Sequence, residues 1–134
     1  MRWNRMREIK FRGKRIDNGK WVYGYFLVNQ FGEHTICDKT FAAAVIPETV
    51  GQFAGLHDRG SKDIFEGDII RYDNFYSDSP EDDAFIITEV KFVSCAFCVL
   101  DEGNWEAFTK IISSDDTEII GNIYENPTLL EVVK

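Results

Sequence analysis

Two segments limit the fold of this 134-residue chain more than any other feature: residues 51–72 and residues 118–130. In the first segment, Glu66-Gly67-Asp68 stands directly before a short β-branched run. Gly67 can adopt a left-handed backbone that redirects the chain, and Asp68 can accept hydrogen bonds from nearby amides. Such an entry into a strand is common in small barrels. Both segments therefore predict strands joined by tight turns.

Strand and turn signals continue through the rest of the chain and predict an all-β fold. In residues 7–15, the apolar Ile9 and Phe11 alternate with charged residues, as in a strand with one buried face. The turn at residues 17–20 contains Asn-Gly, which favours a hairpin. Beyond it we expect an exposed, mobile loop at 74–83 and strands at 21–29, 34–41, 49–56, 62–65, 69–72, 84–93, 94–100, 105–108 and 118–124.

Three local features make more detailed predictions. Gly24 lies inside a predicted strand and indicates a bulge or a close backbone approach. Residues 41–46 fit either a strand or a helical turn, and Pro47 ends the segment in both cases. Asn126-Pro127 predicts a short C-terminal helix with the Asn as its cap and the Pro at its first position.

Three blocks of the sequence resemble the YopX family: MREIKFR at residues 6–12, and the two segments at 51–72 and 118–130. The blocks occur in the family's order, and the resemblance spans the chain from Met6 to about Leu130. It implies a two-part all-β fold whose C-terminal part is a small SH3-type β-barrel. It also implies an origin in a bacterial phage or prophage, and it transfers no catalytic or ligand residues to this chain.

We place the join between the two parts at about Pro47. Residues 1–46 then form an N-terminal β-meander, and residues 47–134 form the SH3-like barrel with its short C-terminal helix. The two parts are small enough to form one compact unit.

Composition places the chain among folded globular proteins, with 44% hydrophobic and 14% aromatic residues. The longest apolar run, Phe41 to Ile46, has six residues, whereas a membrane-spanning helix needs roughly 20. The N-terminus stays charged through Arg15, which does not fit a secretory signal. We therefore expect a protein of the bacterial cytoplasm with no membrane contact.

Three cysteines without a secretory signal predict reduced thiols, most simply as small buried apolar residues. His34, Cys37, Cys95 and Cys98 nevertheless have the ligand types of a Cys₃His zinc site. Residues three apart in an extended strand point to opposite faces, so Cys95 and Cys98 would not face one ion. The sequence therefore favours the structural role and predicts no metal or cofactor, while only a structure shows whether the four residues converge.

No catalytic constellation stands out in the sequence. His34 and His57 are the two candidates for proton transfer near neutral pH, and His34 lies close to Cys37 in the sequence, although nothing in the sequence shows that the two meet in space. Glu66 and Asp68 could form a carboxylate pair, but a turn explains them better. Phosphate-binding loops, dinucleotide fingerprints and nucleophile elbows are absent from the sequence. We therefore expect a protein that is not an enzyme.

Charge is distributed unevenly along the chain. Residues 1–20 contain eight Lys or Arg residues against Glu8 and Asp17, a net charge of +6. The remaining 114 residues contain 7 basic and 21 acidic groups, a net charge of −14, which gives the chain its total of −8. A basic arm on an acidic body can bind an anion or another acidic surface.

Two binding roles follow from this distribution. The basic residues Lys10, Arg12, Lys14 and Arg15, together with nearby aromatic residues, could bind nucleic acid, although the net negative charge opposes it. Exposed sheet edges and an acidic body instead favour a homo-oligomer, or association with a phage or host protein. We prefer the second role, a non-catalytic, self-associating accessory protein, and keep nucleic-acid binding as the alternative.

Overall fold

The computed structural model describes residues 8–73, 85–93, 96–101, 104–107 and 114–133. Within these residues the protein is all-β, and every strand pair with a defined register is antiparallel. The chain divides into two compact units, residues 1–55 and residues 56–134. The loop predicted at residues 74–83 lies outside the described residues.

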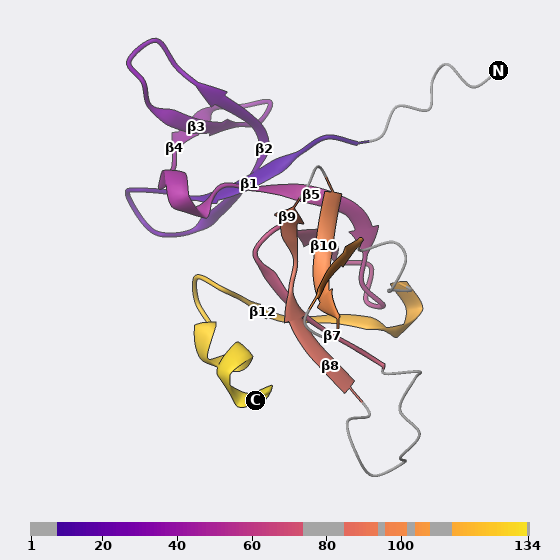
Figure 1. The fold of residues 1–134 in the computed structure, drawn as a ribbon. Helices are drawn as coiled ribbons and strands as arrows, with labels where there is room; N and C mark the ends of the chain where they lie inside the picture. Colours follow the sequence, from indigo (N-terminus) through magenta and orange to yellow (C-terminus); the bar gives the residue numbers. More distant parts are fainter. Residues whose placement is uncertain (1–7, 74–84, 94–95, 102–103, 108–113, 134) are drawn as a thin grey trace, which may run out of the picture. The chain divides into compact units, whose positions relative to one another are not determined.

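The first unit supplies the strands β4-β3-β2-β1-β5 of a six-stranded sheet whose last strand is β6 (Asp63–Phe65) (Figure 1). From β1 to β4, strands that follow each other in sequence are also neighbours in the sheet, which confirms the predicted β-meander. The elements are β1 (Phe11–Lys14), β2 (Trp21–Val28), β3 (His34–Cys37), β4 (Ala42–Ala44), the 3-10 helix η1 (Pro47–Thr49) and β5 (Gly51–His57), which extends into the second unit.

This sheet curls so that its first and fourth strands approach each other. Arg15 forms an isolated antiparallel bridge with Val45, and the amide of Ile46 donates to the carbonyl of Lys14 at 2.8 Å. Gly13 makes the approach possible, because a Cβ at that position would lie 3.1 Å from Cβ of Val45. The buried residues of the unit include Ile36, Ala43, Val45 and Phe53.

Two of the local predictions are resolved in this unit. Gly24 has φ +156°, and a Cβ there would lie 2.1 Å from the carbonyl oxygen of Cys37, so the close backbone approach is confirmed. The ambiguous segment at residues 41–46 contains strand β4 instead of a helical turn. Pro47 then begins η1, because its fixed φ suits the first residue of a helical turn.

The second unit contains two three-stranded sheets, β12-β7-β8 and β11-β10-β9. Its core includes five completely buried side chains: Ile64, Ile69, Ile70, Val90 and Val99. Among the described residues these sheets do not close into a barrel, and the SH3-type closure stays a prediction. The elements are β6 (Asp63–Phe65), β7 (Asp68–Asp73), β8 (Phe85–Glu89), β9 (Lys91–Val93), β10 (Ala96–Asp101), β11 (Asn104–Ala107), the 3-10 helix η2 (Ser114–Asp116), β12 (Thr117–Asn122) and the 3-10 helix η3 (Pro127–Val133).

The turn between β6 and β7 has the chemistry that its sequence predicted. Gly67 has φ +92°, and Oδ2 of Asp68 accepts a hydrogen bond from the amide of Phe65 at 2.7 Å. A Cβ at position 67 would also lie 2.9 Å from the ring of Tyr124. Glycine is therefore required here both by the backbone conformation and by the space available.

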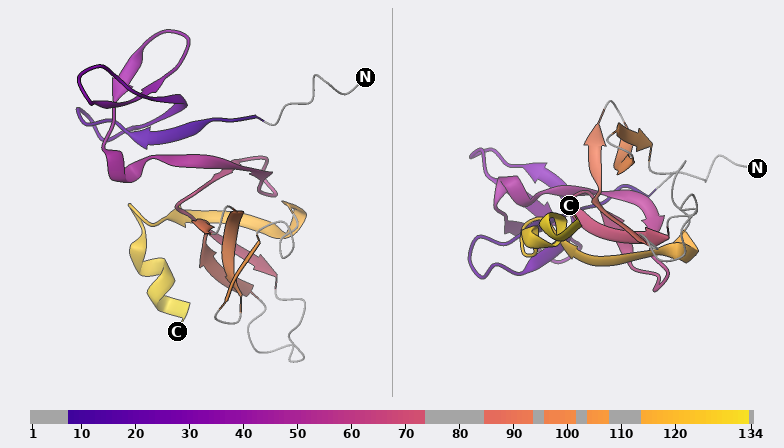
Figure 2. Two further views of the ribbon diagram at one scale, coloured as in Figure 1. Left: turned by 45° about the horizontal axis from the view of Figure 1, so that its top comes forward. Right: turned by 60° about the horizontal axis from the view of Figure 1, so that its bottom comes forward.

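The chain ends in η3, which follows β12 (Figure 2). Pro127 is its first residue, as predicted, but Oδ1 of Asn126 does not cap it. That oxygen accepts from the amide of Asn122 at 3.3 Å, because Gly121 has no Cβ to obstruct it. Asn122 in turn accepts from the amides of Tyr124 and Glu125. No helix in the described part of the chain is long and apolar enough to cross a membrane.

Candidate interaction surface

One face of the first-unit sheet combines aromatic and basic side chains. In the β1–β2 pair, Arg12 lies opposite Tyr23 and Lys14 lies opposite Trp21. Residues directly opposite each other in antiparallel strands share a face, and so do residues two apart along a strand. We call this surface the aromatic face, and its residues are Lys10, Arg12, Lys14, Trp21, Tyr23, Tyr25 and Leu27.

The aromatic face leaves large side chains in contact with water. Tyr23 is 52% exposed, Tyr25 is 71% exposed and Leu27 is 54% exposed. The opposite side of the sheet carries Ile36 and Val45, which are almost completely buried. Strand β2 therefore presents three large exposed residues on this face, whereas Arg12 and Thr35 on the same side of the sheet are buried.

The cations of this face lie over aromatic rings. The guanidinium of Arg12 is 4.5 Å from the centroid of the Trp21 ring, and Nζ of Lys14 is 5.6 Å from the same centroid. Nζ of Lys10 lies 4.9 Å above Phe53 and 3.2 Å from the carboxylate of Glu8. Such cation–π contacts hold the charged groups against the sheet. Arg12 is only 6% exposed, so its charge is largely removed from solvent.

Arg15 is separated from the other three predicted basic residues. It directly follows Lys14, so it points to the other side of the strand. Its guanidinium donates to both carboxylate oxygens of Asp17, at 2.9 and 2.7 Å, and lies 5.3 Å from the centroid of Phe41. The hydrogen bond from Arg15 lowers the pKa of Asp17. The structure thus brings Lys10, Arg12 and Lys14 together and leaves Arg15 in a local ion pair.

Of the four residues considered for zinc binding, the structure describes three, and each has other contacts. His34 packs its ring 5.6 Å from that of Phe26, whereas Sγ of Cys37 contacts the Thr35 hydroxyl at 3.7 Å. Cys98 is buried, and Cys95 lies outside the described residues. In the ranges that the structure describes, no cluster of three or more His, Cys, Asp or Glu residues could hold a metal ion.

The acid–base candidates also have structural partners. Nε2 of His57 lies 2.8 Å from Oδ1 of Asp63 across the β5–β6 hairpin. Asp68 is 2% exposed and accepts the Phe65 amide within its own turn. Glu66 and Asp68 are therefore not presented together to solvent as a carboxylate pair.

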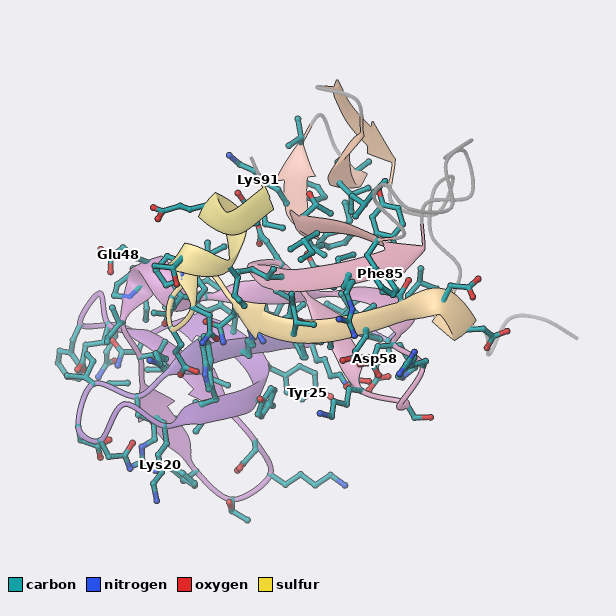
Figure 3. All side chains as sticks on the ribbon, turned by 90° about the horizontal axis from the view of Figure 1, so that it is seen from below. Lys20, Tyr25, Glu48, Asp58, Phe85 and Lys91 are labelled. Atoms are coloured by element: carbon teal, nitrogen blue, oxygen red, sulfur yellow. The ribbon has the colours of Figure 1, made fainter. Side chains whose placement is uncertain are left out.

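Asp58 is the polar residue whose importance the sequence did not reveal. Asp58, which Figure 3 labels, is 6% exposed. Its Oδ1 accepts from the amides of Gly60 and Lys62 at 2.9 Å each. Its Oδ2 accepts from the amide of Ile119 at 3.1 Å. Burial alone would raise the pKa of Asp58, but these hydrogen bonds outweigh it and lower the pKa below its ordinary value. An Asp two residues before a Gly is a typical turn signal, whereas the partner in β12 has no local signal.

Known proteins resemble this chain in sequence and in structure. Residues 1–131 match a family model described as YopX protein. Protein yopX from Bacillus subtilis has a similar crystal structure, with a TM-score of 0.59 and 22% identity over 93% of this chain and 98% of that chain. Protein EF1440 from Enterococcus faecalis is similar with a TM-score of 0.55 and 20% identity over 93% and 99%. These two structures show a likeness of fold, and a search of curated proteins found no match.

Proposed function

The chain belongs to the YopX family, and we propose that it is a non-catalytic protein-interaction module that self-associates through the aromatic face. The observation that carries this proposal is the exposure of Tyr23, Tyr25 and Leu27 by half or more on one side of β2. Aromatic residues are enriched at protein interfaces, because they bury a large area with little loss of conformational freedom. A second copy covering these side chains would remove them from water.

Nucleic-acid binding is the second candidate, because Lys10, Arg12 and Lys14 share a face with three aromatic rings. Single-stranded nucleic acid binds such faces by stacking its bases and neutralising its phosphates. Two of these cations are poorly placed to bind phosphate, because Arg12 is 6% exposed and Lys10 is paired with Glu8. The protein-binding role is therefore preferred. A net charge of −8 also opposes association with a polyanion.

The non-catalytic character is supported by the positions of the two histidines. His57 is held by Asp63 at the end of a hairpin, and His34 packs against Phe26. The Asp63 carboxylate can orient the His57 ring, but neither contact places beside an imidazole the nucleophile that covalent catalysis requires. The proposal also includes an accessory role in a bacterial phage or prophage, a cytoplasmic location, and a phage or host protein as a further partner.

Light scattering on purified protein tests the role of the aromatic face. The double variant Tyr23→Ser/Tyr25→Ser should reduce the solution mass to that of one chain. The matched control is Phe85→Ser, because Phe85 is 51% exposed in the second unit and Tyr23 is 52% exposed. The control should keep the mass of the unaltered protein. A mass that is the same in all three proteins would remove the aromatic face from the proposal.

A further inference from the structure

Strand β2 extends beyond the neighbouring strand that covers its first half. The register of the β1–β2 pair ends where Phe11 lies opposite Gly24, whereas β2 continues to Val28. On its other side, β2 is paired with β3 from Tyr25 onward. Residues 25–28 are therefore paired with β3 but not with β1, and we call this stretch the open edge.

The backbone of the open edge points away from β3 at Phe26 and Val28. The amide of Asn29 donates to the carbonyl of Glu33 at 2.9 Å, so Asn29 belongs to a hydrogen-bonded pair that continues the β2–β3 ladder. Such pairs alternate along antiparallel strands, so Leu27 bonds to β3 as well. The amides and carbonyls of Phe26 and Val28 are then directed to the side of β1. Within the described residues, no hydrogen bond reaches these groups from that side.

The side chains of the open edge do not protect it from pairing. Residues 21–32 contain no charged residue and no proline. Tyr25, Leu27 and Val28 are each at least 46% exposed. Natural proteins usually protect an edge with charges, proline or a covering segment, because a strand with open amides and carbonyls is a template for another strand. The open edge of β2 therefore fits an added strand.

We infer that two copies of the chain pair their open edges in antiparallel orientation, so that β3 and β2 of both copies form one continuous sheet. This inference rests on the proposed function and adds how the two copies meet. The open edge is self-complementary when Leu27 lies on the two-fold axis. Phe26 of each copy then exchanges its backbone hydrogen bonds with Val28 of the other. Because the open edge has no charged side chain, no like charges meet across the axis.

The same pairing uses the aromatic face. Tyr25 and Leu27 belong to that face, and the two-fold axis places Leu27 of one copy directly opposite Leu27 of the other. Exposed apolar side chains and open backbone groups are then removed from water together. The pairing uses the same edge of both copies, so it closes at two chains and predicts a dimer.

Cross-linking at the axis tests this register. In Leu27→Cys, the Cα atoms of the two axial residues would lie about 4.5 Å apart, within the reach of a disulfide. Added oxidised glutathione takes up the electrons and protons that the two thiols release and is itself reduced to glutathione. We expect a disulfide-linked species of twice the chain mass, with the bond at position 27 of both chains.

Tyr25→Cys is the matched control, because Tyr25 is exposed on the same face of the same strand. In the proposed register, position 25 of one copy and position 25 of the other lie about 14 Å apart along the strands, which no disulfide spans. The unaltered protein controls for the natural cysteines. Equal cross-linking at positions 25 and 27 would overturn the inference, and so would its absence at position 27 in a protein that has the mass of a dimer.

Amide exchange in the unaltered protein, followed by NMR, gives a readout that does not depend on a variant. Pairing of the open edges would protect the amides of Phe26 and Val28, whereas the amide of Leu27 already belongs to the β2–β3 ladder. Exchange at Phe26 and Val28 should therefore slow as the protein concentration rises, with little change at Leu27. Edge amides that exchange at one rate at all concentrations would contradict the pairing.

The solution mass separates this inference from the proposed function. If the unaltered chain has the mass of one copy at all concentrations, the proposed function fails and the edge pairing fails with it. If the mass exceeds one copy while the axial cross-link and the amide protection are both absent, self-association stands and only the edge pairing fails. A mass increase that appears only with an added oligonucleotide would overturn both proposals and support the nucleic-acid alternative.

Discussion

The carboxylate of Asp58 accepts a hydrogen bond from the backbone amide of Ile119, a residue 61 positions further along the chain, at 3.1 Å. The neighbouring amide of Arg59 donates to the carbonyl of Thr117 at 2.8 Å. The two contacts attach the β5–β6 turn to β12. Asp58 therefore connects the two sequence blocks that identify the fold, and its role is structural.

Removal of the Asp58 carboxylate should destabilise the protein. In Asp58→Ala, the amides of Gly60, Lys62 and Ile119 lose their acceptor in a part-buried turn, and the free energy of unfolding should fall by about 3 kcal/mol, roughly 1 for each hydrogen bond. Urea denaturation followed by circular dichroism measures this change. The control Asp115→Ala alters an exposed acid and should stay within about 0.5 kcal/mol of the unaltered protein. Equal stability of both variants would contradict the role of Asp58.

The same carboxylate should make stability depend on pH. Its pKa in the folded protein lies below the ordinary value of 3.8, so its contribution is complete above that value and is lost as the pH falls through the folded pKa. Between about pH 6 and pH 2, the unaltered protein should lose more stability than Asp58→Asn, whose side chain does not titrate. Identical losses in the two proteins would show that Asp58 does not contribute to acid sensitivity.

A methyl group at position 24 should disrupt the first unit. In Gly24→Ala, the new Cβ would lie 2.1 Å from the carbonyl oxygen of Cys37, so β2 and β3 must separate. The matched control is Gly32→Ala, which also has positive φ but has nothing within 4 Å of the added atom. The control should cost about 1 kcal/mol from backbone strain alone, and Gly24→Ala should cost clearly more. Thermal denaturation compares them, and equal midpoints would refute the steric account.

Local signals predicted much of the fold. Gly67 and Asp68 act as their turn sequence indicated, and the strand runs at residues 21–29 and 69–72 correspond closely to β2 and β7. Each of these features depends on residues that are near each other in the chain. Backbone preference and side-chain alternation are therefore sufficient to find them.

Features that depend on distant residues were not predictable in the same way. Asp58 had the signal of an ordinary turn residue, because its contact with Ile119 exists only after β12 has packed. The Asn126 side chain contacts Asn122 instead of capping η3, since Gly121 leaves room for it. Arg12 was a candidate for phosphate binding, but the pairing of β1 with β2 places it over Trp21.

The solution mass of the unaltered protein tests the central claim most directly. Light scattering should be recorded at about 50 and 200 mM salt, with and without mixed single- and double-stranded nucleic acid, because phosphate-driven binding weakens strongly over this range. We expect a mass above that of one 15.5 kDa chain, increasing with protein concentration and unchanged by nucleic acid. A mass of one chain that rises only with nucleic acid at low salt would contradict self-association through the aromatic face.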